Sequence, residues 1–163
     1  MNTGMSELLN EAKIKTPFSG LEPSDKLKLT MPNLIALNDS VLMRDQYESS
    51  SHLKPSEFQD LTGYECLLNH VHLPYDGSRE SLISCLCYAT ALQERLSGFE
   101  QGRQFLVIVT FSADGCVVRF HQRRPNETWL TDDLEGYREE AVLVLCTDDR
   151  EAQTRCAKTT LDG

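Results

Sequence analysis

The clearest pattern lies in the middle of the chain, where apolar positions change from helical to strand spacing. Across residues 81–96, apolar side chains recur every three or four positions, which predicts an amphipathic helix. The turn before it offers Asp76 or Ser78 as the capping residue. Residues 105–111 are rich in β-branched and aromatic side chains and predict a strand. A helix followed by a strand is therefore the central feature of the predicted fold.

The pattern after this strand predicts a hairpin and a further strand. Residues 112–115 contain an Asp-Gly turn, and residues 116–121 form the return strand. Residues 129–130 begin a third strand or a turn, and Thr131 can cap a short helical or turn segment after it. The apolar run at residues 141–146 predicts the last strand.

The amino-terminal third is less regular. Residues 6–15 predict one short helix, and the rest of segment 1–53 is predicted to be an arm or an extended segment that wraps the core. Ser56 is predicted to cap a helix, because Gln59 follows at the capping-box spacing. The predicted fold class is α+β: residues 54–163 form a small antiparallel sheet packed against two or three helices.

Length and charge narrow the functional classes. The chain has 163 residues, of which 40% are hydrophobic, and this suits one globular domain with an appendage. There are 25 acidic and 16 basic residues, for a net charge of −9. This charge argues against a general nucleic-acid binder and favours a basic partner. The chain shows neither an apolar export signal nor a membrane-spanning run, so a cytoplasmic location without a membrane partner is expected.

The cysteines are predicted to be reduced thiols, because most of them lie in apolar runs of a chain without an export signal. They are Cys66, Cys85, Cys87, Cys116, Cys146 and Cys156. The Cys85-x-Cys87 pair lacks the C-x-x-C spacing of redox enzymes. A cysteine–histidine nucleophilic pair stays open, since such pairs meet only in three dimensions.

His70 and His72 are the candidate metal ligands. On an extended segment the two side chains share a face, and Cys66 lies one helical turn before them. Zinc requires three or four ligands, so His121 or a cysteine would have to complete the site. The simpler interpretation is that Asn69, His70 and His72 end a helix, where imidazoles satisfy its last carbonyl groups.

Residues 119–124 form the basic cluster of the chain. On a strand, Arg119, His121 and Arg123 would share one face, as in some nucleic-acid-binding surfaces. The alternative is that these cations pair with nearby carboxylates, for which the sequence offers Glu127, Asp132 and Asp133.

Acidic residues concentrate near the carboxyl end. The segment 132–151 holds eight acids and two bases, so it carries −6 of the total charge of −9. The acids are Asp132, Asp133, Glu135, Glu139, Glu140, Asp148, Asp149 and Glu151. Such a run is either a solvated face that keeps the protein soluble, or a patch that attracts and docks a basic protein.

Part of the chain resembles a known class of proteins. The run GCVVRFHQRRPNETWLTDDLEGY at residues 115–137, followed by EEAVLV and preceded at residues 68–73 by LNHVHL, resembles small bacterial immunity proteins. These are encoded beside polymorphic or contact-dependent growth inhibition toxins. The resemblance covers residues 65–146 and implies a cytosolic protein that binds one toxin domain, in many cases a basic nuclease, and blocks its active site or docking surface.

The sequence thus predicts a non-catalytic immunity protein without cofactor or metal, whose partner is a basic toxin domain. The predicted partner-binding residues are Trp129, Asp132, Asp133, Glu135, Tyr137, Glu139 and Glu140. Two alternatives remain. One is a metal- or cysteine-dependent hydrolase that uses His70, His72 and His121. The other is a phage-type inhibitor or adaptor that mimics the charge of nucleic acid.

Overall fold

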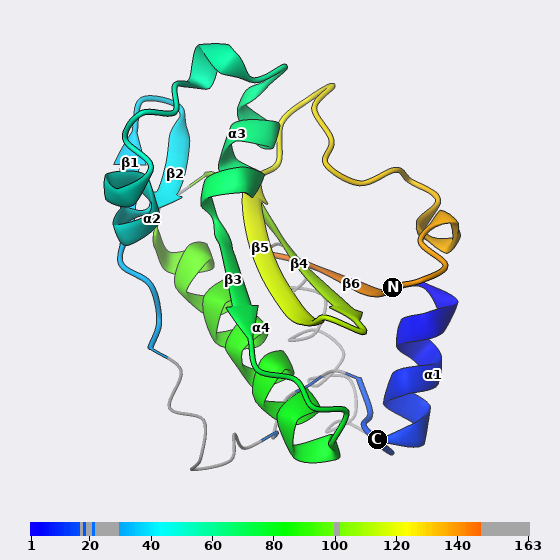
Figure 1. Ribbon diagram of the computed structural model, residues 1–163. Helices are drawn as coiled ribbons and strands as arrows, with labels where there is room; N and C mark the ends of the chain where they lie inside the picture. Colours follow the sequence, from blue (N-terminus) through cyan, green and yellow to red (C-terminus); the bar gives the residue numbers. More distant parts are fainter. Residues whose placement is uncertain (17, 19–20, 22–29, 100–101, 148–163) are drawn as a thin grey trace, which may run out of the picture.

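A computed structural model describes residues 1–16, 18, 21, 30–99 and 102–147 (Figure 1). Within these residues the chain forms four α-helices and two antiparallel sheets, which confirms the predicted α+β class. The elements are α1 (Thr3–Glu11), β1 (Leu34–Leu37), β2 (Ser40–Met43), α2 (Arg44–Ser49), α3 (Leu61–Leu68), β3 (His70–Leu73), α4 (Arg79–Phe99), β4 (Phe105–Ser112), β5 (Gly115–Gln122) and β6 (Ala141–Cys146). Short 3₁₀ turns occupy Pro55–Glu57 and Leu134–Gly136.

The larger sheet has four strands in the order β3-β5-β4-β6. Every neighbouring pair is antiparallel, and the β4–β5 hairpin turns at Gly115, whose φ of 125° favours glycine. Because side chains alternate along a strand, the sheet has two distinct faces. We call the face against α4 the inner face and the opposite face the outer face.

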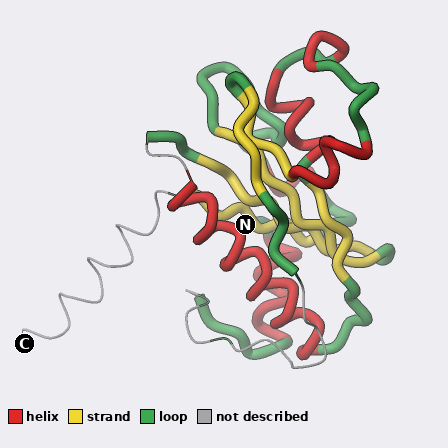
Figure 2. The backbone as a smooth tube through the Cα atoms, turned by 90° about the vertical axis from the view of Figure 1, so that its left-hand side faces the viewer, coloured by secondary structure: helices red, strands yellow, loops and turns green. Residues whose placement is uncertain are grey.

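The hydrophobic core lies between the inner face and α4 (Figure 2). The strands contribute Leu73, Phe105, Val107, Val109, Cys116, Val118, Phe120 and Leu143, all of which are buried. The helix contributes the stripe at Leu82, Cys85, Leu86, Ala89, Leu92 and Leu96. This is the stripe that the apolar spacing of residues 81–96 predicted. The helix itself is longer than predicted and spans Arg79–Phe99. Asp76 and Ser78 together begin α4: the Ser78 hydroxyl accepts from the Ser81 amide, and Asp76 accepts from the Ser78 amide.

Segment 1–53 contributes to this core at several points. Met5, Leu9, Val41 and Met43 are buried in it. The first helix begins earlier than the predicted residues 6–15, because Asn2 caps it by accepting a hydrogen bond from the Met5 amide (3.0 Å). The hairpin of β1 and β2 was not predicted. Its strands have four residues each, too short for a periodic signal.

Glu65 and Asn69 of α3 join this hairpin to the rest of the molecule. One edge of strand β2 faces α3. The side chains of Glu65 and of the helix C-cap Asn69, one helical turn apart, form hydrogen bonds with the backbone groups along this edge. The Val41 amide donates to Glu65 Oε1 (3.1 Å), and the Met43 amide donates to Asn69 Oδ1 (2.9 Å). Asn69 Nδ2 donates in turn to the Val41 carbonyl (2.8 Å). The two side chains thus take the place of a neighbouring strand.

Glu65 also forms a buried ion pair with Arg124, which follows the end of β5. Arg124 Nη2 lies 2.7 Å from Oε1 and Nη1 lies 2.9 Å from Oε2 of the carboxylate. The Glu65 side chain is fully buried and that of Arg124 is 10% exposed. The Gln122 amide donates to the same carboxylate (2.7 Å), and Arg124 donates to the Asp39 carbonyl (2.6 Å). One carboxylate therefore connects α3, β2 and β5.

The predicted helix start at Ser56 is wrong. Pro55–Glu57 forms a single 3₁₀ turn, closed by the Glu57 carboxylate on the Lys54 amide (2.7 Å), and the chain is extended again at Phe58. The helix begins at Leu61, where Asp60 accepts from the Gly63 amide (2.7 Å). Asp60 is therefore the true N-cap.

We expect Glu65→Ala to lower the free energy of unfolding by about 3–5 kcal/mol, because it leaves a desolvated guanidinium and two buried amides without their acceptor. Denaturant unfolding measures this. The matched control is Glu48→Ala, which removes a surface pair with Arg44 (3.6 Å; side chains 62% and 52% exposed) and should cost less than about 1 kcal/mol. Similar losses in both variants would contradict the central role of Glu65.

Candidate functional site

The outer face of the four-stranded sheet carries most of the residues that the sequence singled out. The strand register places His70 beside Arg119 and His72 beside Val117, and on the next strand Ile108 and Thr110 lie beside that arginine and that valine. Helix α3 lies over the end of β5, and the segment of residues 123–140 crosses the remaining part of this face (Figure 1). The open part between them is the candidate functional site.

Segment 123–140 is tied down at both ends. At its start, Glu127 accepts from the amide and the hydroxyl of Thr62 at the beginning of α3 (3.0 and 2.9 Å). At its end, the Asn2 side chain donates to the carbonyls of Tyr137 (3.1 Å) and Glu140 (2.8 Å). Because helices α3 and α1 hold it from opposite ends, the segment is preorganised over the sheet.

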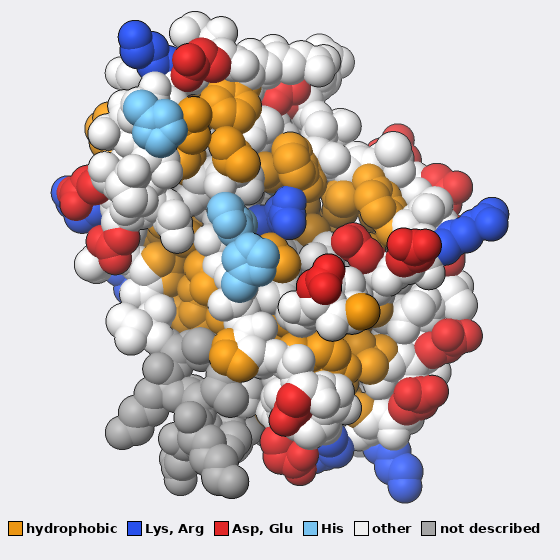
Figure 3. Space-filling model, in the orientation of Figure 1, with side chains coloured by type: hydrophobic (Ala, Val, Ile, Leu, Met, Phe, Trp, Pro, Cys, Tyr) orange, Lys and Arg blue, Asp and Glu red, His pale blue; other side chains and the backbone are white. Residues whose placement is uncertain are grey.

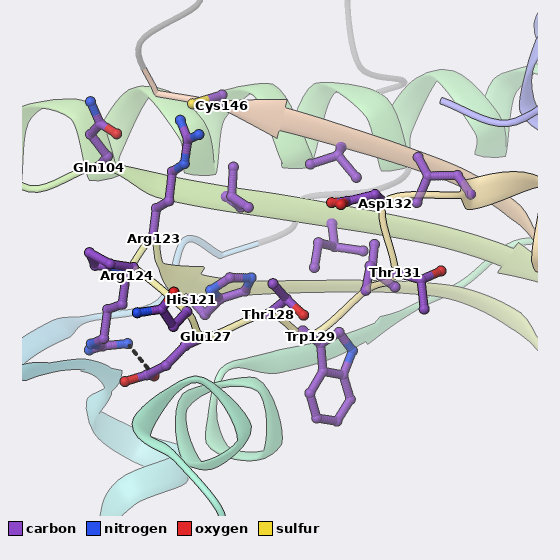
Figure 4. Close-up of a pocket in the computed structure, with 17 residues that line it drawn as sticks. Gln104, His121, Arg123, Arg124, Glu127, Thr128, Trp129, Thr131, Asp132 and Cys146 are labelled. Carbon is purple, nitrogen blue, oxygen red and sulfur yellow. Dashed lines mark ion pairs between the residues drawn. The ribbon is translucent and has the colours of Figure 1, made fainter.

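A cleft of about 810 Å³ lies between the sheet and this segment (Figure 4). Its sheet side is apolar and is formed by Leu106, Ile108 and Val144. Arg123 and Asp132 line the opening, and His121 lies at one end. The volume falls within the range of roughly 300–1,000 Å³ typical of ligand pockets. An apolar side chain or a small ligand can therefore enter here.

His121 is a buried, neutral side chain. It is 2% exposed, and its Nδ1 lies 2.9 Å from the Gln122 carbonyl oxygen. Burial lowers its pKa, so that the uncharged ring predominates at neutral pH. A carbonyl oxygen only accepts, so Nδ1 carries the proton and Nε2 is the acceptor nitrogen.

Trp129 forms neither the predicted strand nor a core contact typical of tryptophan. It is 40% exposed, and its ring covers the guanidinium of Arg119, whose Cζ lies 5.4 Å from the ring centroid. This cation–π contact fixes the side chain on the outer face. Exposed Trp and Arg in contact are a composition typical of interface hot spots.

The two histidines lie side by side, as an extended segment requires. Their rings meet edge to face with centroids 5.3 Å apart, and His70 Nδ1 lies 2.7 Å from the Leu67 carbonyl oxygen. His70 thus satisfies a carbonyl at the end of α3, as one interpretation predicted, while His72 lies within β3. In the part of the chain that the structure describes, no three His, Cys, Asp or Glu side chains form a group suited to a metal ion. His121, which the sequence suggested as a third ligand, is buried and does not form such a group with His70 and His72.

The five described cysteines form no disulfide with one another. Burial raises the pKa of Cys66 to about 12, and burial together with a hydrogen bond to Cys85 raises the pKa of Cys116. At neutral pH the thiolate of Cys66 is therefore about one part in 10⁵, and the thiolate is the nucleophilic form. Cys156 lies outside the described residues.

The basic cluster is divided among different roles. Arg124 forms the buried pair with Glu65 and lies 4.0 Å from Glu127, which was one of the predicted local carboxylates. Arg119 lies beneath Trp129, and Arg123 is exposed at the cleft. The face does not present a continuous row of free arginines. Arg119 and His121 share the outer face as predicted, whereas Arg123 follows the strand.

Four acidic residues of segment 132–140, Asp132, Asp133, Glu135 and Glu139, are exposed at the edge of the outer face, and Glu140 is half-buried (Figure 3). Two of them also have local structural roles. Glu135 accepts from the Thr3 amide of α1 (2.9 Å), and Asp133, rather than the predicted Thr131, caps the short 3₁₀ turn. Asp132 and Glu139 make no hydrogen bond or ion pair with any residue that the structure describes. Asp148, Asp149 and Glu151 lie outside the described residues.

We expect Cys66, Cys85 and Cys116 to resist alkylation in the native protein at pH 7, because all three are buried and Cys66 and Cys116 are held as thiols. Mass spectrometry of alkylated peptides measures this. In denaturant without reductant, six thiols per chain should react. Rapid native alkylation of Cys66 would favour a cysteine nucleophile, and a count of four or fewer would indicate disulfides.

We expect the purified protein to hold no stoichiometric zinc or iron, because the histidine pair lies next to the fixed positive charge of Arg119. Elemental analysis of the protein and of His70→Ala tests this. About one metal ion per chain, lost in the variant, would overturn the expectation and favour the hydrolase.

Comparison with known proteins gives the family but no related protein of known role. No curated protein and no solved structure matches the chain. None of the helices in the described ranges has the length and apolar character that crossing a membrane requires. Residues 1–157 match the sequence model of one protein family. This matched range includes the whole outer face and the helices that support it. The chain belongs to the Uncharacterized protein PM0498 family.

Proposed function

We propose that this protein is a non-catalytic binding protein that docks a basic protein domain on the outer face of its sheet. The partner that best suits it is a toxin domain, and the protein acts as its immunity protein. One observation carries the proposal: segment 123–140 holds six acidic residues and an exposed tryptophan in a fixed position over the sheet face opposite α4.

The mechanism is occlusion. Asp132, Glu139 and their acidic neighbours attract a basic surface and pair with the lysines and arginines that the toxin uses for its substrate. Trp129 and the half-buried Tyr137 supply anchors that slow dissociation. The apolar floor of the cleft can receive one side chain of the partner. Because the segment is already ordered, little conformational entropy is lost on binding.

The alternatives find less support on this surface. For a hydrolase, the described residues offer a histidine pair without a third ligand, and burial raises the pKa of the Cys66 thiol. For a nucleic-acid mimic, acidic groups would have to follow the spacing of phosphates, whereas here Arg119 and Arg123 lie among them. A toxin gene beside this gene favours the immunity protein, and a phage operon favours the mimic.

The test reverses charge at Asp132 and Glu139, whose side chains are exposed and support no contact among the described residues. We expect Asp132→Lys with Glu139→Lys to leave the melting temperature nearly unchanged. Affinity for the product of the adjacent toxin gene should fall about 100-fold, because like charges then face each other across a partly dehydrated interface. Calorimetry measures the affinity, and stopped-flow kinetics should show a lower association rate with a weaker salt dependence.

The matched control is Glu7→Lys with Glu11→Lys on the exposed side of α1, which changes the net charge equally. It should weaken binding less than about threefold. An equal loss in both variants would show that total charge alone matters. No loss in either would leave the acidic segment as a solubilising face and refute the proposal.

A further inference from the structure

Arg119, at the centre of the outer face, is a cation without an acidic partner. Its Nε is buried and has no hydrogen-bond partner, and no carboxylate lies within ion-pair distance of the guanidinium in the described part of the chain. Buried polar groups are almost always satisfied, because an unsatisfied one destabilises the folded state. By contrast, Arg124 in the same cluster is fully paired. The missing partner of Arg119 is therefore a feature that requires explanation.

The surroundings hold the guanidinium in place and leave it accessible. Trp129 covers it, with 5.4 Å between Cζ and the ring centroid, and His70 is its direct neighbour across the β3–β5 pair. His70 is fixed by its hydrogen bond to the Leu67 carbonyl, and the ring of His72 packs against it. Arg119 as a whole is only half-buried, so solvent reaches the side chain. Figure 3 shows the histidine pair with a basic side chain beside it in the middle of this face.

We infer that Arg119, flanked by Trp129 and His70, is the binding site for one oxyanion, a carboxylate supplied by the docked partner. A guanidinium presents a planar fork of donors that matches the two oxygens of a carboxylate, and it stays charged at every physiological pH. The stacked indole keeps the fork oriented and shields one of its faces from water, which strengthens the interaction.

The inference rests on the proposed function for the origin of the carboxylate, and it specifies the partner further. The outer face then has a cation at its centre and acidic residues at its edge. A partner that fits is basic overall but presents one Asp or Glu side chain opposite Arg119. Such a pattern disfavours proteins that are merely basic, because they would leave the Arg119 side chain without an acidic partner.

The test uses Trp129, the single tryptophan of the chain, as a reporter. The full chain is titrated with N-acetylglutamate and, separately, with inorganic phosphate, at an ionic strength kept constant with sodium chloride. Occupation of Arg119 should change the emission of Trp129 in a saturable way, since the guanidinium lies against the indole ring. Stronger binding of N-acetylglutamate than of phosphate supports a protein carboxylate as the ligand. Stronger binding of phosphate would contradict this assignment.

Two variants locate the site. Arg119→Gln should weaken the binding of N-acetylglutamate at least about tenfold, whereas Arg123→Gln, an equal charge change at the cleft, should alter it less than about twofold. Amide chemical shifts followed by NMR give the affinity independently of the emission of each variant. Equal affinities in the two variants, or the absence of any saturable response, would overturn the site.

The two proposals fail separately. The Asp132→Lys and Glu139→Lys protein should still bind N-acetylglutamate, because neither residue contacts Arg119. Retained toxin affinity in that variant refutes docking through the acidic edge and leaves the anion site intact. Retained toxin affinity in Arg119→Gln refutes the assignment of the carboxylate to the partner.

Discussion

The buried pair of Glu65 and Arg124 is the interaction on which the arrangement of this molecule depends. A carboxylate with no exposure is stable only if its lone pairs are occupied, and here two guanidinium nitrogens and the amides of Val41 and Gln122 occupy them. Those donors come from β2 and from the end of β5, and the carboxylate itself comes from α3. The pair therefore brings the β1–β2 hairpin, α3 and the end of β5 to one point, where segment 123–140 also begins.

The organisation of the outer face follows from that point. Arg124 sets the direction in which the chain leaves β5, and Glu127 ties the same turn to the start of α3. The segment then passes over Arg119, places Trp129 on it, and reaches Asn2 and α1. A continuous set of charged and polar contacts thus holds the tryptophan, the acidic edge and the cleft in fixed relative positions. This fixed arrangement supports the binding role proposed above.

The sequence predicted the elements whose signals are local. The spacing of apolar residues located α4, the β4–β5 hairpin and the last strand, which begins at Ala141 and ends at Cys146 as predicted. The prediction of the helix start failed because two residues suit the capping position. Ser56 and Asp60 are both good N-cap residues, but Ser56 lies in the separate 3₁₀ turn Pro55–Glu57, and Asp60 caps α3. Four-residue strands such as β1 and β2 carry no periodicity of their own.

Only part of the candidate site could be predicted from the sequence. The shared face of His70 and His72 and the exposure of Asp132 and Glu139 follow from local pattern. The burial of Glu65 could not be predicted, since nothing near it in sequence distinguishes it from a surface glutamate. The different environments of Arg119 and Arg124 could not be predicted either, because both belong to one basic run. Arg119 has no acidic partner within the described residues, whereas Arg124 forms the buried pair with Glu65.

Hydrogen exchange of the protein alone and bound to the basic toxin domain proposed as its partner tests the central claim most directly, namely that the outer face is the binding surface. The account predicts slower exchange on binding in segment 123–140 and at His70 and His72, with little change in the buried helix α4. Protection of α2 and the β1–β2 hairpin, with segment 123–140 unaffected, would contradict it.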